Sequence, residues 1–89
     1  MIIHIFIVMD KRFLHKVVDQ LVSETKIIDD RVYTPFYPSS LSLSPITSSF
    51  YFFSFSSHCK NVYGLNVKEI EYVWGEYKNI INEKLNNGL

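Results

Sequence analysis

The chain ends in a segment whose helix signals all agree, NVYGLNVKEIEYVWGEYKNIINEKLNNGL. Asn66 is a favourable N-cap residue, and Glu69 follows it at the spacing of a capping box. Leu65 and Ile70 occupy the two positions of a hydrophobic staple. Gly88 stands where a left-handed C-terminal cap is expected. Together these signals predict a helix over residues 66–86 that buries one face.

Apolar residues recur along this helix at the 3.6-residue period of an amphipathic helix. The expected buried stripe consists of Val67, Ile70, Val73, Trp74, Tyr77, Ile80, Ile81 and Leu85. Trp74 lies at its centre and is expected to anchor a core or an interface. Tyr72 and Gly75 lie on the polar flank, where a tyrosine beside a residue without a side chain suits a contact with a partner. The candidate interaction residues are therefore Tyr72, Trp74, Gly75 and Tyr77, with neutral drift as the alternative for the two flank positions.

A second amphipathic helix is predicted over residues 10–26, with Asp10 as its N-cap. Its apolar side consists of Phe13, Leu14, Val17, Val18, Leu21 and Val22. This stripe covers about half of the helix circumference, which is wider than a coiled-coil seam. We therefore expect the helix to lie against two neighbours.

Residues 25–34 have the pattern of a short hairpin. A two-residue turn at Asp29 and Asp30 would place Ile27 opposite Val32 and Thr25 opposite Thr34. The type I′ turn of such hairpins favours glycine at its second position, and Asp30 is not glycine. An irregular loop is the alternative reading.

Residues 35–57 form a low-complexity segment rich in serine and phenylalanine. There is no lysine, arginine, aspartate or glutamate between Arg31 and Lys60, and three prolines exclude a continuous helix. The run SFYFFSFS is compatible with one strand. A connection of about 30 residues is long for a compact domain, so we expect a disordered insert or a segment that a partner orders. Residues 58–89 then form the unit that contains the capped helix.

Residues 1–9, MIIHIFIVM, are almost entirely apolar. The run is far shorter than the ~20 residues that span a bilayer, and it lacks the pattern of a secretory signal. It reads as a buried strand, as an apolar extension of the next helix, or as an upstream start with Met9 as the true first residue.

The side chains that could support chemistry do not form a known catalytic or metal-binding pattern. His58 and Cys59 are adjacent, but a nucleophile and its base need converging side chains and a third group that orients the base. His4, His15 and His58 have no ligand spacing. We therefore expect no enzymatic activity, no metal and no cofactor. A lone cysteine also favours a reducing compartment, and hence a cytoplasmic location.

The charge balance argues against nucleic acid as a partner, because nine basic and nine acidic residues cancel. A small basic patch near the start of the first helix consists of Lys11, Arg12, His15 and Lys16. With Asp10 and Asp19 nearby, a solvated surface is favoured over a phosphate or membrane site. The absence of alanine and the abundance of Ile, Asn, Lys and Phe are typical of an AT-rich genome, so residue frequencies alone carry little weight.

The sequence as a whole predicts a mainly α fold with minor β structure, in which the two amphipathic helices pack on each other. At 89 residues the chain is a single small domain of marginal stability, and its apolar stripes exceed what two helices can cover. We therefore expect a small non-enzymatic interaction or structural accessory protein that associates with itself or with a larger protein. The alternative is a peripheral membrane protein anchored by the N-terminal apolar run and the Phe-rich segment.

Overall fold

The computed structural model of the protein describes residues 10–29, 31–37, 41–42 and 49–88. The order of elements is α1 (Lys11–Ser23), β1 (Lys26–Ile28), β2 (Arg31–Tyr33), β3 (Leu41–Ser42), α2 (Ser49–His58), the π-helix η2 (Cys59–Tyr63) and α3 (Val67–Gly88). The fold is mainly α with minor β structure, as the sequence predicts. The N-terminal run MIIHIFIVM lies outside the described residues.

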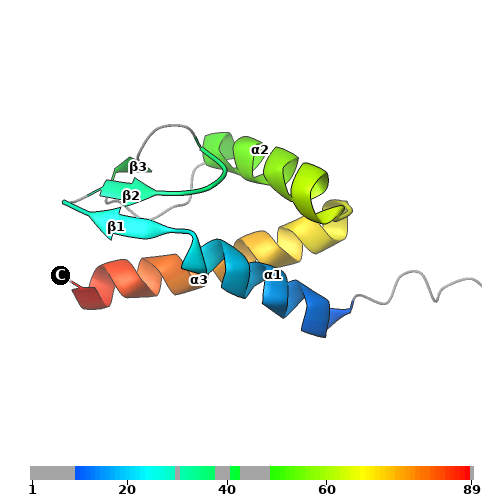
Figure 1. The fold of residues 1–89 in the computed structure, drawn as a ribbon, viewed down its shortest axis with the longest axis horizontal. Helices are drawn as coiled ribbons and strands as arrows, with labels where there is room; N and C mark the ends of the chain where they lie inside the picture. Colours follow the sequence, from blue (N-terminus) through cyan, green and yellow to red (C-terminus); the bar gives the residue numbers. More distant parts are fainter. Residues whose placement is uncertain (1–9, 30, 38–40, 43–48, 89) are drawn as a thin grey trace, which may run out of the picture.

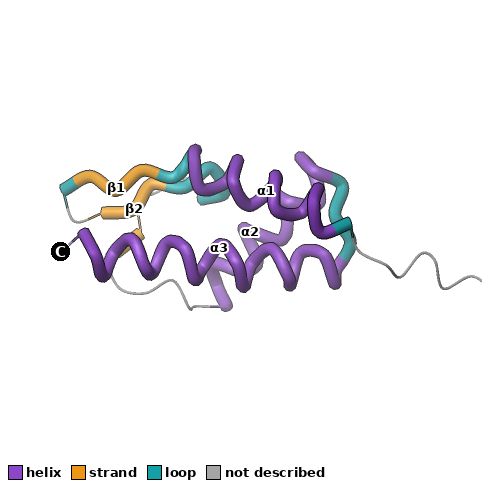
Figure 2. The backbone as a smooth tube through the Cα atoms, turned by 90° about the horizontal axis from the view of Figure 1, so that it is seen from below, coloured by secondary structure: helices purple, strands orange, loops and turns teal. Residues whose placement is uncertain are grey.

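The longest helix, α3, is the element on which both α1 and α2 pack. Figures 1 and 2 show α1 running alongside α3 in the same direction, so that both helices begin at the same end of the molecule. The small sheet follows α1 and lies beside the C-terminal half of α3. None of the described helices is both long and apolar enough to cross a lipid bilayer.

The ends of the two predicted helices form as their local sequence dictates. The Asp10 carboxylate accepts a hydrogen bond from the Phe13 backbone N–H at 3.2 Å. The Asn66 side chain accepts from the Glu69 N–H, and the Glu69 carboxylate accepts from the Asn66 N–H, each at 2.9 Å. This reciprocal pair is the predicted capping box, which satisfies backbone donors that the first turn leaves free.

The hairpin prediction is confirmed, because β1 and β2 pair antiparallel with Ile27 opposite Val32. Thr25 and Thr34 lie just outside the paired residues. Asp29 adopts a left-handed backbone conformation with φ of 50°, which aspartate tolerates better than most residues. A third strand that the sequence pattern did not predict, β3, pairs antiparallel with β2.

The expectation of a strand in SFYFFSFS is wrong, because these residues form most of α2. All three prolines of the segment precede Ser49, so they exclude a continuous helix through it but not a helix that begins after Pro45. The segment also supplies core side chains, since Phe36 and Phe55 are buried. The expectation of a disordered insert is therefore wrong for the described part of this segment.

Burial follows most of the two predicted stripes. The core from these helices consists of Leu14, Val17, Val18, Leu21, Ile70, Val73, Trp74, Tyr77, Ile81 and Leu85. Four predicted members depart from the pattern: Val67 is 70% exposed, Phe13 is exposed, and Val22 and Ile80 are half-buried. Val67 and Phe13 both lie in the first turn of a helix, where fewer neighbours are available to cover a side chain. Gly88 is the last helical residue, so the predicted left-handed cap at this position is wrong.

Candidate interaction surface

Two of the four candidate interaction residues, Trp74 and Tyr77, lie in an aromatic cluster between α3, α2 and the loop that follows β2. Their rings stack at a centroid distance of 6.2 Å, and Phe55 lies 4.5 Å from Trp74 and 5.6 Å from Tyr77. Phe36 completes the cluster, 5.1 Å from Phe55 and edge-on to it. Aromatic pairs at these separations add stability beyond the burial of their area. Trp74 and Tyr77 therefore anchor the core of this chain.

Tyr77 also joins the two amphipathic helices through its hydroxyl group. The hydroxyl shares a hydrogen bond of 2.8 Å with Thr25 Oγ1, just beyond the end of α1. The Thr25 hydroxyl in turn donates to the Leu21 carbonyl at 2.7 Å. Burial raises the pKa of Tyr77 to about 12, and the hydrogen bond to Thr25 opposes this rise.

The other two candidates, Tyr72 and Gly75, are not part of this cluster. Tyr72 is half-buried against α1, where its hydroxyl shares a hydrogen bond of 3.0 Å with His15 Nε2. Lys11 Nζ lies 5.6 Å from the centroid of the Tyr72 ring. Open space surrounds the Cα of Gly75, so no neighbour requires a glycine there. The structure therefore does not bring the four candidates to one surface.

His58 and Cys59 occupy the junction between α2 and η2. Cys59 is completely buried, and desolvation raises the pKa of its thiol to about 12, so the thiol is protonated at neutral pH. It packs in the core as a small apolar side chain. No group of histidine, cysteine and acidic side chains in the described part of the chain could hold a metal ion.

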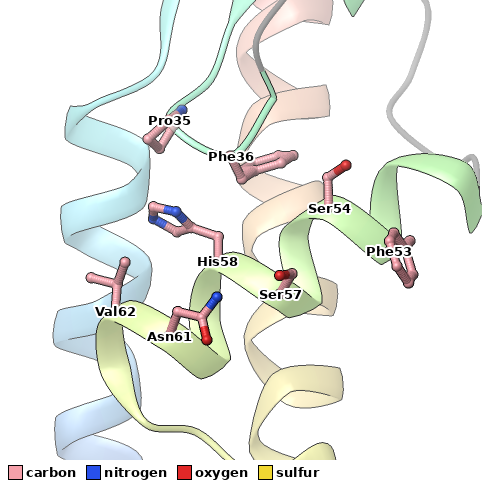
Figure 3. A pocket seen from close by; sticks show the side chains of 8 residues that line it. All are labelled: Pro35, Phe36, Phe53, Ser54, Ser57, His58, Asn61 and Val62. Carbon is pink, nitrogen blue, oxygen red and sulfur yellow. The ribbon is translucent and has the colours of Figure 1, made fainter.

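The outer face of α2 and η2, on the side away from Phe55, carries a pocket. We call this face, together with the pocket, the α2–η2 surface. The pocket has a volume of about 420 Å³ and is lined by Pro35, Phe36, Phe53, Ser54, Ser57, His58, Asn61 and Val62. Phe36 separates it from the aromatic cluster, because its ring contacts the cluster and also lines the pocket. Figure 3 shows Phe53 and Val62 at opposite ends of the pocket.

Phe53 and Val62 are unusually exposed for apolar side chains, at 76% and 58%. Helix α2 has no apolar stripe of the usual kind, because its aromatic residues are spread around the helix and alternate with serine and histidine. In this chain α3 covers one side of α2, and the α2–η2 surface is left without a cover among the described residues.

The π-helical turn η2 shapes one end of this surface. Its five residues follow α2 without a break, and Gly64 ends it in the left-handed conformation, with φ of 69°. The Gly64 N–H donates to the Lys60 carbonyl at 3.2 Å and the Leu65 N–H to the Cys59 carbonyl at 3.4 Å, which closes the turn. Short π-helical turns are rare and frequently occur at functional sites.

Two buried side-chain atoms have no hydrogen-bond partner within the described residues, His58 Nε2 and Thr34 Oγ1. His58 lines the pocket, and Thr34 directly precedes Pro35 in its wall. An unpaired buried polar group costs about 1–3 kcal/mol. Both unpaired buried atoms of the described residues therefore lie beside the α2–η2 surface.

This surface is not apparent from the sequence because its parts come from two separated segments, Pro35–Phe36 and residues 53–62. One signal was present: Gly64 directly follows an uninterrupted proline-free run, which is typical of a helix end. Comparison with known proteins adds no assignment, because no family model, curated protein or solved structure matches the chain.

Proposed function

We propose that this chain is a small non-enzymatic protein-interaction protein and that it docks through the α2–η2 surface. The observation that carries the proposal is Phe53, a phenylalanine that is 76% exposed at the edge of a pocket whose exposed wall is more polar than apolar. An exposed aromatic side chain with polar groups around it is typical of an interaction surface. The pocket wall contains no charged side chain, which suits a protein partner better than nucleic acid. We further propose a cytoplasmic location, on the basis of the lone buried thiol.

Site-specific photocrosslinking in the native cells of the protein tests this proposal. A photoreactive benzoylphenylalanine replaces Phe53 or Val62, and Asn79, an exposed residue of α3, is the matched control position. We expect one discrete adduct from positions 53 and 62 and none from position 79. Equal labelling at all three positions, or no adduct at 53 and 62, would contradict docking through this surface.

One observation favours the membrane surface as a second candidate partner. Phe13 is 43% exposed on α1, and the neighbouring basic side chains of Lys11, Arg12 and Lys16 are exposed as well. An apolar side chain among cations suits an anionic bilayer. Flotation of the protein with phosphatidylserine vesicles checks this reading: binding that is lost in Phe13→Ser would support it, and failure to float would exclude it.

A further inference from the structure

We propose that the occupant of the α2–η2 surface is a second copy of this chain, related to the first by a two-fold axis that passes close to Ser57. This inference rests on the proposed function, because it names the partner of the same surface. In a two-fold interface each surface meets itself, so the surface must be complementary to its own copy. The charge and hydrogen-bonding groups of the α2–η2 surface and the positions of its exposed apolar side chains each allow such self-contact.

The pocket wall is uncharged, so two copies can meet there without repulsion between like charges. None of the residues that line the pocket is lysine, arginine, aspartate or glutamate, and the exposed Lys60 of η2 is not among them. When a charged face meets its own copy, like charges face each other, which costs several kcal/mol. The α2–η2 surface avoids this cost, and it offers no attraction that would favour a charged partner over a second copy.

The polar groups of the pocket can also satisfy their own copies. Three of its polar side chains, Ser54, Ser57 and Asn61, each contain both a hydrogen-bond donor and an acceptor. A wall of lysine or aspartate side chains would present only donors or only acceptors to its copy. Serine and asparagine can therefore pair with the same residues of a second chain.

The positions of the exposed apolar side chains allow an antiparallel arrangement of two copies. Phe53 and Val62 project at the two ends of the pocket, and Ser57 lies between them in the sequence and on the exposed side of α2. Two copies of α2 that cross antiparallel near Ser57 bring Phe53 of each copy beside Val62 and the pocket of the other. Because a contact over one helical face is at the small end of specific interfaces, we expect a dissociation constant in the micromolar range.

Sedimentation velocity of the full chain over a range of concentrations tests the proposal. The parent chain should change from monomer to dimer as concentration rises, and Phe53→Ser should raise the dissociation constant by about tenfold or more, as expected for a central aromatic anchor. Ser57→Lys and Ser57→Glu should each be monomeric, because like charges then meet at the axis. An equimolar mixture of these two variants should dimerise again. Asn79→Lys and Asn79→Glu, at an exposed site on α3, should behave like the parent chain.

The remaining outcomes separate this inference from the proposed function. A parent chain that stays monomeric at every concentration overturns the homodimer, while an adduct from position 53 to a different protein would still support docking through this surface. A dimer that persists in Phe53→Ser and in both Ser57 variants also overturns it. Circular dichroism checks that each variant is folded, and Val62→Ser, which alters another exposed side chain, replaces any variant that is not. It should weaken the dimer as well.

Discussion

At the scale of single residues, two phenylalanines of α2 have opposite roles although one position separates them. Phe55 is completely buried and contacts Phe36, Trp74 and Tyr77. Phe53 points away from this cluster and lines the pocket with 76% of its surface exposed. Position on the helix, rather than residue type, therefore decides whether a phenylalanine stabilises the fold or remains available for a partner.

This difference predicts how the two alanine variants behave. Phe55→Ala should lower the free energy of unfolding by about 3–5 kcal/mol, because it leaves a cavity in the aromatic cluster. A loss of that size approaches the whole stability expected of a small domain. Phe53→Ala should leave the stability within about 0.5 kcal/mol of the parent chain, as for other surface changes. Urea denaturation at a concentration low enough to keep the chain monomeric measures both, and equal losses would show that α2 is packed differently.

At the scale of elements, local chemistry explains which parts of the fold were predictable. The starts of α1 and α3 follow from Asp10 and from the Asn66–Glu69 pair, because a cap needs only residues within one turn. The pairing of Ile27 with Val32 follows from the turn length in the same way. Helix α2 was not predicted, because its aromatic residues are spread around the helix and leave no periodic stripe for the sequence to reveal.

The α2–η2 surface could not be predicted, for a related reason. Its floor is Phe36, which reaches α2 only because the chain folds back after β2 and packs on the aromatic cluster. The sequence correctly placed Trp74 in a core or an interface, but it did not identify the side chains on the other side of α2 as the exposed ones. Contacts between segments that are distant in the sequence decide which face of a helix without an apolar stripe remains open.

At the scale of the whole molecule, no described residue with a charged side chain is buried. The titratable groups of the buried core are therefore the thiol of Cys59 and the hydroxyl of Tyr77, which are neutral when protonated. Burial raises the pKa of Cys59 from 9.0 to about 12 and that of Tyr77 from 10.0 to about 12. Below pH 9 both groups are protonated in the folded and in the unfolded chain, so they add no pH dependence there. Above pH 9 the unfolded chain releases protons that the folded chain retains.

The free energy of unfolding should therefore be insensitive to these two groups near neutral pH and should fall between pH 9 and 12. Each group contributes a slope of about 1.4 kcal/mol per pH unit once its unfolded form has ionised. Urea midpoints measured from pH 8 to 11 check this expectation, with Cys59→Ala as the comparison. That variant is less stable at every pH because of the cavity it creates. Its decline should begin nearer pH 10, where Tyr77 and the partly buried Tyr63, whose pKa burial also raises, remain to titrate. If parent and variant decline in parallel from the same pH, the buried thiol is not the group that senses alkaline pH, and Cys59 is more accessible to water than its position in the core implies.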